Sequence, residues 1–390
     1  MKILFDYQTF EEQKIGGISR YFHELISHFK NSDGVKPELS IKYTSNEYLK
    51  NAQHFKNKIL GDYNFYNEFL YGINFKGKGK LLHLKNKLTG NDKINANKKL
   101  SIECIKKGHF DLFHPTDYNS YYLDYIGNKP FVVTAYDMIH EIFPEHLSLN
   151  SPISKNKKKI FEKASKIIAI SENTKRDIVT IFNINENKID VVYLANSLNK
   201  ETFAGKQVEL NNLPNNYLLF VGSRLTYKNF YFFITSIVPL LEKDPALHVV
   251  CTGIPFNKNE LAFFHRLGIE KQLHQYYVND VQLAYLYNHA LAFIFPSLYE
   301  GFGIPVLEAF ACECPALLSN TSSLPEIGGD AAAYFEPKDA LSIRNAIASV
   351  IYNNDKRKQL IEKGIEQHKK FSWELTAKKT LEVYKKVIKN

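Results

Sequence analysis

Short runs of apolar residues alternate along this chain with stretches whose apolar residues recur at helical spacing. The first run is at residues 2–6, and from Ile18 to Phe29 the apolar positions fall on one face of a helix. Further runs of strand length lie at 112–114, 131–134, 166–170, 189–194, 217–221, 248–253, 275–278 and 291–295. This alternation is typical of parallel sheets whose strands are joined by helices, so we expect an α/β fold.

A chain of 390 residues is too long for one ordinary hydrophobic core, so we expect two Rossmann-like parallel-sheet domains with ligand loops at their strand ends. Residues 1–195 form the first domain, and a polar, asparagine-rich stretch at 196–216 is the candidate linker. The second domain is expected at 217–371. Residues 372–390 have the spacing of an amphipathic final helix.

Two helix starts carry recognisable capping residues. Ser171 precedes an acid-rich first turn and predicts a helix at 172–182. Ser323 is followed three residues later by Glu326, which predicts a capping box in which each side chain bonds to the backbone of the other residue.

Positive charge is concentrated in the first half of the chain. Residues 1–200 carry 30 Lys and Arg against 22 Asp and Glu, and residues 201–390 carry 20 against 19, within a net charge of +9. Lysine without interleaved arginine or a recognisable binding module argues against a nucleic-acid partner. The lysine-rich segments at 76–107 and 155–159 fit either a solvated face or a surface for anionic lipid head groups or a lipid-pyrophosphate acceptor.

The compartment is predicted from what the sequence lacks. It has no apolar run of 18 residues and no cleavage-site pattern after Met1, so we expect neither a transmembrane helix nor a signal peptide. Its four cysteines lack the spacing of a zinc site and fit reduced thiols. We therefore expect a cytoplasmic protein, with peripheral binding to the inner face of the membrane if the lysine-rich face meets lipid.

Residues 296–310, PSLYEGFGIPVLEAF, carry the strongest chemical signal. Glu300 falls in the loop after a strand, and Glu308 falls eight residues later on the next helix. Gly301 and Gly303 allow backbone to approach a ligand closely, and the N–H groups that open the helix favour a phosphate. Two carboxylates beside them suit the hydroxyls of a sugar and of a ribose, which indicates a nucleotide-sugar site. A glycine-containing turn with a solvated glutamate fits the spacing equally well.

This stretch resembles the E-x7-E motif of retaining glycosyltransferases of family 4, also called group 1, which have the two-domain GT-B fold. Residues 314–337 continue the resemblance. The likeness covers most of 1–30 and nearly all of 110–390, and it is strongest at 221–229 and 293–337. It is most similar to the mannosyltransferase-like subgroup of bacterial surface polysaccharide synthesis, and it implies that the last helix crosses back onto the first domain.

Arg224 and Lys228 follow the strand at 217–221, where they could neutralise a phosphate. No Asp-x-Asp pair occurs in the sequence, so the usual carboxylate seat for a catalytic magnesium or manganese ion is missing. The family carries an arginine and a lysine in this loop and is metal-independent, which the resemblance transfers to these two residues. The alternative is a surface loop with two solvated charges.

Four further positions face the ligand in the resembled family. Gly16 and Gly17 match a glycine loop that faces the donor diphosphate. Asp137 matches the second residue of a His-Asp pair, and we expect an acceptor-side or structural role for it. Tyr136 stands where the family has the histidine, which puts an imidazole at this spot in doubt. His140 could take its place if the loop folds back.

The resemblance implies a role for each residue of the E-x7-E stretch. Glu300 would hold the donor sugar, the backbone of Gly303 and Ile304 would contact sugar and phosphate, and Glu308 would bind ribose hydroxyls. Phe302 would lie beside them in the donor site. Arg224 and Lys228 would stabilise the leaving diphosphate.

The expected function is therefore a retaining, metal-independent hexosyltransferase with no cofactor besides its nucleotide-sugar donor. The resemblance implies mannose from GDP-mannose, transferred to a hydroxyl of a growing O-antigen, capsule or similar lipid-linked glycan. Two alternatives stay open. One is a UDP-sugar-dependent glycosyltransferase of the same fold, and the other is a membrane-associated scaffold without turnover, which the tyrosine at position 136 motivates.

Overall fold

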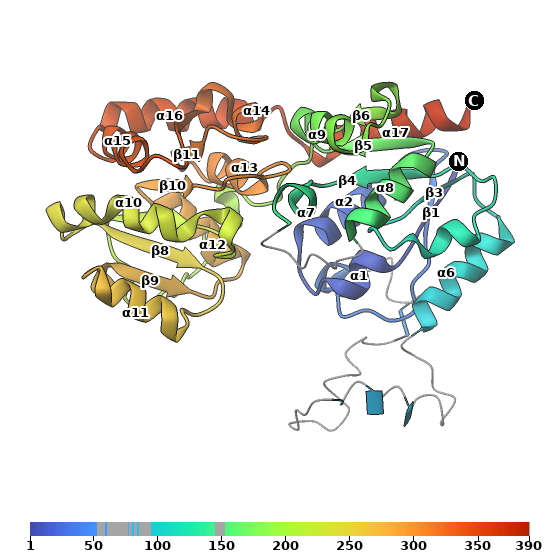
Figure 1. Ribbon diagram of the computed structural model, residues 1–390, viewed down its shortest axis with the longest axis horizontal. Helices are drawn as coiled ribbons and strands as arrows, with labels where there is room; N and C mark the ends of the chain where they lie inside the picture. Colours follow the sequence, from blue (N-terminus) through green and yellow to red (C-terminus); the bar gives the residue numbers. More distant parts are fainter. Residues whose placement is uncertain are drawn as a thin grey trace.

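The computed structural model describes residues 1–52, 59–60, 77, 80–81, 84–85, 95–144 and 153–389. Part of the lysine-rich segment at 76–107 lies outside these residues. The described chain forms two halves, each with parallel strands covered by helices, and the halves lie side by side along the longest axis of the molecule (Figure 1).

The N-terminal half contains two three-stranded parallel sheets, ordered β2-β1-β3 and β4-β5-β6. A backbone bridge between Phe113 and Phe131 joins their facing edges. The strands are β1 (Lys2–Phe5), β2 (Lys36–Leu39), β3 (Leu112–His114), β4 (Val132–Ala135), β5 (Lys166–Ala169) and β6 (Ile189–Val191). Strands β3 and β4 are buried along their whole length, which explains their continuous apolar runs.

The C-terminal half contains one six-stranded parallel sheet, ordered β12-β11-β10-β7-β8-β9. The strands are β7 (Tyr217–Phe220), β8 (His248–Thr252), β9 (Leu273–Tyr276), β10 (Ala292–Phe295), β11 (Ala316–Ser319) and β12 (Ala332–Phe335). Strand β10 lies between β11 and β7, with Phe295 opposite Leu318. The loop after β10 therefore leaves the sheet at the carboxyl ends of its strands, where open α/β sheets bind ligands.

Helices connect these strands, and several begin and end where the sequence predicts. Helix α9 covers the predicted range, and the Ser171 side chain accepts the N–H of Thr174 at its start. Helix α2 buries the predicted apolar face, including Tyr21 and Phe29. The helices are α1 (Gln8–Glu12), α2 (Gly17–Lys30), α3 (Glu47–Asn51), α6 (Ala96–Lys107), α7 (Ile139–Ile142), α8 (Ile153–Lys163), α9 (Glu172–Phe182), α10 (Phe230–Lys243), α11 (Lys258–Arg266), α12 (Asp280–His289), α13 (Ile304–Ala311), α14 (Leu324–Gly328), α15 (Ala340–Ile351), α16 (Asn354–His368) and α17 (Trp373–Ile388).

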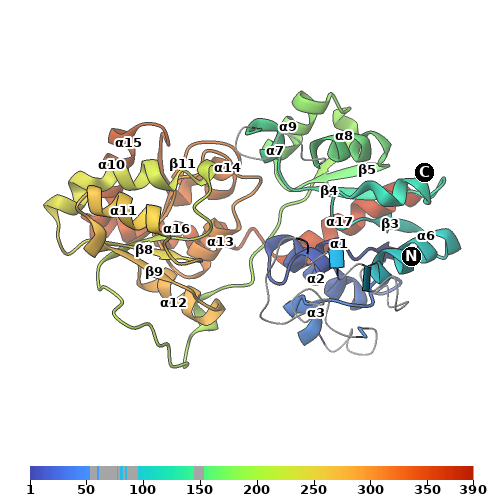
Figure 2. The same ribbon diagram turned by 60° about the horizontal axis from the view of Figure 1, so that its bottom comes forward.

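The final helix lies on the N-terminal half. Helix α17 packs against α2 and β5, far from the C-terminal sheet (Figures 1 and 2). The indole N–H of Trp373 donates to Ser197 Oγ at 2.9 Å, and the hydroxyl of the buried Tyr384 bonds to the ring of His114. The chain thus passes between the halves twice, once after β6 and once before α17.

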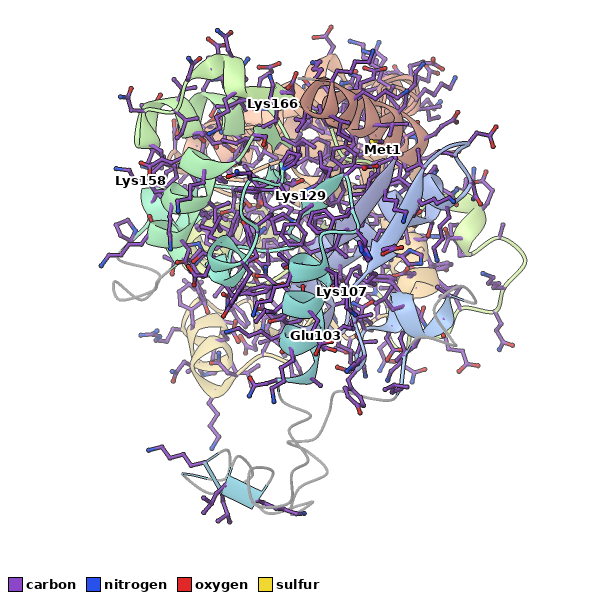
Figure 3. All side chains as sticks on the ribbon, turned by 90° about the vertical axis from the view of Figure 1, so that its right-hand side faces the viewer. Met1, Glu103, Lys107, Lys129, Lys158 and Lys166 are labelled. Atoms are coloured by element: carbon purple, nitrogen blue, oxygen red, sulfur yellow. The ribbon has the colours of Figure 1, made fainter. Side chains whose placement is uncertain are left out.

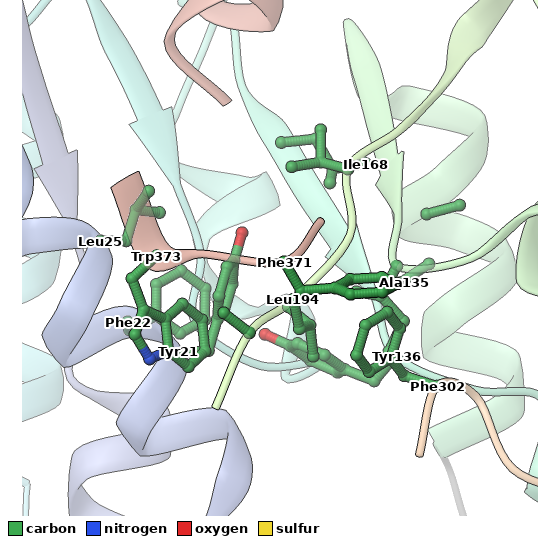
Figure 4. Close-up of a cluster of buried hydrophobic side chains, with 14 of the residues drawn as sticks. Tyr21, Phe22, Leu25, Ala135, Tyr136, Ile168, Leu194, Phe302, Phe371 and Trp373 are labelled. Carbon is green, nitrogen blue, oxygen red and sulfur yellow. The ribbon is translucent and has the colours of Figure 1, made fainter. Parts of the chain in front are cut away.

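Aromatic side chains from both halves meet where the halves join (Figure 4). The ring of Phe302 lies 6.2 Å from that of Tyr193 and 6.0 Å from that of Phe371, measured between centroids. Trp373 lies 6.4 Å from Tyr21 in the same region. This apolar packing stabilises the contact between the halves without fixing them as firmly as one continuous sheet would.

Lysines spread over the end of the N-terminal half that faces away from the C-terminal sheet (Figure 3). Some of them have protein partners: Lys166 lies 3.1 Å from Asp190, and Lys129 donates to the carbonyl of Phe110 at 2.9 Å. Neither of the two interpretations of the lysine-rich segments is decided by these contacts, and lipid binding stays a prediction.

Candidate functional site

A cavity of about 390 Å³ lies between the two halves, and Tyr136 and Gly301 are among the residues that line it. Seven of the residues expected to be catalytic or donor-binding line it as well. The N-terminal half contributes two of them and the C-terminal half five, and they are Gly17, Asp137, Glu300, Phe302, Gly303, Ile304 and Glu308. Gly17 opens α2, and a Cβ atom placed on it would lie 3.6 Å from Ile304 Cδ1. The glycine loop and the E-x7-E stretch therefore face each other across this cavity.

The conformation of the loop after β10 depends on a glycine and on two serines. Gly303 has a φ of 104°, in the left-handed region that favours glycine, and it stands at the N-cap of α13. The hydroxyl of Ser322 accepts the N–H of Glu300, and the hydroxyl of Ser323 donates to the carbonyls of Glu300 and Phe302, each at 2.9 Å. The backbone on both sides of Glu300 is thus held in place.

The predicted capping box at Ser323 and Glu326 is wrong. Ser323 makes no side-chain cap with its own helix, because its hydroxyl bonds to the loop before α13. The Glu326 carboxylate instead accepts the N–H groups of Glu172 and Asn173, at 2.7 and 3.1 Å. It therefore caps the start of α9, which belongs to the other half of the molecule.

The N-terminal half holds the residues on either side of Glu300. The hydroxyls of Ser171 and Thr174 donate to the carbonyl of Gly301, at 2.7 and 3.1 Å. Before Glu300, the hydroxyl of Tyr299 donates to Asp177 Oδ2 at 2.6 Å. Sequence reasoning missed these contacts, because a serine at a helix start is explained by capping alone.

Gly301 lies directly against the other half. A Cβ atom at this position would stand 1.8 Å from the carbonyl oxygen of Tyr136. Any other residue would push the two halves apart, so glycine is required here by a close approach.

Lys228 and Glu300 form an ion pair, in which Glu300 lines the cavity and Lys228 is outside the set of lining residues. Lys228 Nζ lies 2.6 Å from Glu300 Oε1, and both side chains are mostly buried. Burial disfavours the charged amine, but the adjacent carboxylate of Glu300 outweighs it and raises the pKa of Lys228. The lysine therefore stays positively charged beside the carboxylate that the sequence singles out.

Arg224 is not brought to the cavity. Its guanidinium pairs with Glu260, and its Nη2 donates to the carbonyls of Ile254 and Pro255 at 3.0 and 3.2 Å. Its Nη1 is buried and has no hydrogen-bond partner among the described residues. The pairing with Glu260 was not foreseen, since the two residues are 36 positions apart. A phosphate-binding role for Arg224 stays a prediction.

Glu308 is buried at the floor of the cavity region and bonds to Tyr287, whose hydroxyl lies 3.2 Å from Glu308 Oε2. Burial raises the pKa of Glu308, against the opposing effects of Arg20 and of this hydrogen bond. Arg20 comes one turn after Gly17 and pairs with Asp280 of α12 at 2.8 Å. This contact between the halves was not predicted either.

Three residues of the N-terminal half do not face the cavity in the way that the sequence predicts. The hydroxyl of Tyr136 donates to the carbonyl of Thr116 at 3.0 Å, so it is already engaged within the protein. His140 does not line this cavity but a neighbouring one, which Asp137 also lines. Gly16 precedes α2 and packs against Gln13, outside the set of lining residues.

The described residues contain neither a metal-binding cluster nor a membrane-spanning helix. Within 1–52, 95–144 and 153–389, no group of three or more His, Cys, Asp or Glu side chains is arranged to hold a metal ion. Metal independence stays a prediction. No helix in the described part of the chain combines the length and the apolar composition that a membrane crossing requires.

Two family models match consecutive parts of the chain. Residues 15–195 match the model described as Glycosyltransferase Family 4, and residues 202–367 match the model described as Glycosyl transferases group 1. Together they cover both halves of the molecule and all seven predicted residues that line the cavity.

Curated relatives match shorter regions. O-antigen chain mannosyltransferase B of Escherichia coli is 42% identical over 109 residues, which are 28% of this chain and 29% of that protein. O-antigen chain mannosyltransferase RfbU of Salmonella typhimurium is 29% identical over 187 residues, which are 47% of this chain and 50% of that protein. The matched region therefore spans half or less of the length of these relatives.

Solved structures show the fold. The glycosyltransferase from Rickettsia africae ESF-5 superposes with a TM-score of 0.67 at 19% identity, covering 100% of this chain and 99% of that one. The Anabaena protein Alr3699/HepE in complex with UDP-glucose superposes with a TM-score of 0.68 at 16% identity, covering 99% of this chain and 100% of that one. The GT-B fold expected from the sequence is thereby confirmed.

Proposed function

Because the chain belongs to the family 4 and group 1 glycosyltransferases, we propose that it transfers mannose from GDP-mannose to a hydroxyl of a bacterial surface glycan, with retention at the anomeric carbon. The names of its relatives, which are O-antigen chain mannosyltransferases, support this sugar and this class of product. The observation that carries the proposal is the cavity between the halves, where Glu300, Glu308 and the start of α13 converge opposite Gly17.

Each group at the cavity has a chemical task in this proposal. Glu300 accepts hydrogen bonds from hydroxyls of the donor sugar, and Glu308 accepts them from the ribose. The first N–H groups of α13, at Gly303 and Ile304, bind phosphate oxygens with the help of the helix dipole. Phe302 forms an apolar wall beside them.

In this proposal the protein acts by positioning the donor and the acceptor and by stabilising the charge of the leaving group. The bond between the anomeric carbon and the phosphate oxygen breaks, and its electron pair stays on the diphosphate. The acceptor oxygen bonds to the same face of the sugar, and its proton passes to the leaving phosphate. Lys228, which pairs with the cavity residue Glu300, is a cation and stabilises the charge that develops there. For Arg224 to act in the same way, it must first leave the carboxylate of Glu260.

In this proposal no metal ion or other cofactor is required, since Lys228, joined by Arg224 once it leaves Glu260, takes the place of a bound metal. The acceptor is a lipid-linked or free oligosaccharide, and the lysine-rich end of the N-terminal half binds anionic lipid at the inner face of the membrane. Flotation with anionic liposomes tests that last point. Association that disappears as salt is added supports it, and no association at low salt refutes it.

A UDP-sugar is the competing donor, and the structure of Alr3699/HepE with UDP-glucose motivates it. A thermal-shift panel of GDP-mannose, UDP-glucose and ADP-glucose separates these donors, because a bound ligand stabilises the protein by mass action. The proposal predicts the largest rise in melting temperature with GDP-mannose. It also predicts transfer to a mannoside, which Glu300→Ala abolishes. Binding without transfer, unchanged by Glu300→Ala, would instead favour a non-catalytic scaffold.

A further inference from the structure

A second cavity adjoins the first. It has a volume of about 370 Å³, is lined by the N-terminal half, and shares Ile18, Tyr136 and Asp137 with the first cavity. In any glycosyl transfer the acceptor hydroxyl must reach the anomeric carbon of the donor, so the acceptor must occupy space next to the donor sugar. The second cavity is such a space.

The lysine that lines this cavity cannot bind an anion. Lys157 Nζ donates to the backbone carbonyl of Asp137 at 2.8 Å and to Glu141 Oε2 at 3.0 Å, and it lies 3.5 Å from Asp137 Oδ1. An ammonium group has three N–H donors, and these three contacts use them. The Lys157 side chain is 1% exposed, so its ammonium group is also closed to solvent.

The other polar groups of this cavity are acids, amides and an imidazole. Glu12 and Asp117 lie next to each other, and loss of solvation raises the pKa of both carboxyls. The neighbouring Asp117 raises the pKa of Glu12 further, whereas the hydrogen bond with Glu12 opposes the rise in the pKa of Asp117. His140 has a buried Nδ1 with no hydrogen-bond partner in the described part of the chain. Asn119 and Asn156 add amide groups. Such a lining can exchange hydrogen bonds with hydroxyls, and among the residues that the structure describes it offers no unpaired cation.

On the basis of the function proposed above, we propose that the second cavity binds the acceptor and admits an uncharged, hydroxyl-bearing sugar while excluding one that carries a phosphate or a carboxylate. An anionic substituent would face Glu12, Asp117 and Asp137, and the described lining residues supply no free counter-ion. The anionic part of a lipid-linked acceptor therefore stays outside the cavity, and only its terminal neutral sugar enters.

Ligand-observed NMR on the full chain tests this selectivity without requiring turnover. The probes are methyl α-mannoside and its 6-phosphate. We expect the neutral probe to bind at least about 10-fold more tightly, because bringing like charges together is costly. Asp117→Asn should weaken binding of the neutral probe by about 5-fold, since it removes a charged hydrogen-bond acceptor.

A charge reversal provides the sharper comparison. Glu12→Lys places a cation at the rim and should bring the affinities for the two probes to within about 3-fold of each other. Glu162→Lys adds the same charge on the exposed face of α8, outside the cavity, and should leave the ratio unchanged. Melting temperatures verify that the variants are folded.

Three results would overturn the proposal: equal binding of both probes by the unmodified chain, no binding of the neutral probe, or the same change of ratio in both lysine variants. Hydrolysis of GDP-mannose is measured separately. If the chain binds the neutral probe selectively but neither hydrolyses nor transfers from GDP-mannose, the donor assignment fails and the acceptor selectivity stands.

Discussion

At this site, the buried charge of Lys228 and that of Glu300 depend on each other. Each is a charged group largely removed from water, and each is tolerated there because the other lies 2.6 Å away. A mutation of either therefore acts on stability as well as on chemistry, so the two effects have to be measured separately.

We expect Lys228→Ala to lower the free energy of unfolding by about 3 kcal/mol, because it leaves the Glu300 carboxylate buried without a counter-ion. Transfer should fall at least about 100-fold, since a cation near the leaving group is lost. Urea denaturation and initial rates measure the two effects. Lys200→Ala is the matched control, because its ion pair with Glu313 at 2.8 Å is exposed and should contribute less than about 1 kcal/mol. Equal losses of stability in the two variants would contradict the argument.

Gly301→Ala tests the close approach between the halves. Its Cβ would collide with the carbonyl of Tyr136, so we expect small-angle scattering to show a more extended molecule and transfer to be lost. In Gly34→Ala the new Cβ meets nothing within 4 Å, although the glycine has a φ of 73°. That control should cost about 1–2 kcal/mol locally and leave the scattering curve unchanged. A compact Gly301→Ala molecule would refute the role assigned to this glycine.

At the scale of elements, the start of α9 links the two halves. Its own Ser171 and a carboxylate from the other half, Glu326, both satisfy its first N–H groups. Because the same Ser171 also bonds to Gly301, the position of α9 and that of the loop around Glu300 depend on each other.

Glu326→Ala should therefore reduce transfer by about 10-fold while costing about 1 kcal/mol of stability, the usual effect of losing a helix cap. Asn353→Ala removes a cap of α16 whose side chain, among the described residues, bonds to Lys356 of its own helix. It should cost the same stability and leave transfer unchanged. If both variants lose the same activity, or if neither does, the coupling between α9 and the loop around Glu300 is absent.

Helices and motifs were predictable from the sequence where the residues that determine them are close together in the chain. Apolar spacing and the Ser171 cap place α9 at its observed bounds, and the E-x7-E spacing brings Glu300 and Glu308 to one cavity. The choice of partner by a polar side chain was not predictable. Ser323 and Glu326 have the spacing of a capping box, but each finds a better-placed partner in another element.

The partner of Arg224 was not predictable for the same reason, at longer range in the sequence. Its position after β7 is the one expected, but the spacing of charges within a loop does not reveal that Glu260, on a later helix, will pair with it. The resemblance to a family indicates which residues gather near a ligand. It does not indicate how they bond to one another before the ligand arrives.

At the scale of the whole molecule, the described parts of the two halves are joined by apolar packing, by side-chain hydrogen bonds such as those of Ser171, Tyr299 and Glu326, and by an ion pair. Arg20 of α2 and Asp280 of α12 lie 2.8 Å apart, and Asp280 is mostly exposed. A double-mutant cycle of Arg20→Ala and Asp280→Ala should give a coupling of less than about 1 kcal/mol, which salt reduces further. Thermal unfolding at low and high salt measures it. A larger coupling that resists salt would show that this pair, more than the α9 contacts, holds the halves together.

The two passages of chain between the halves are themselves tied together. Trp373 donates to Ser197 at 2.9 Å, and the ring of His368 bonds to Asn196 at 2.8 Å, so the outgoing and returning backbones are fastened at neighbouring points. Two connections fastened at neighbouring points make this region the natural pivot between the halves. If the halves open for substrate exchange, the motion would be a hinge rotation about this region. The ends of the molecule farthest from it would then move most, and the aromatic side chains near Trp373 would move least.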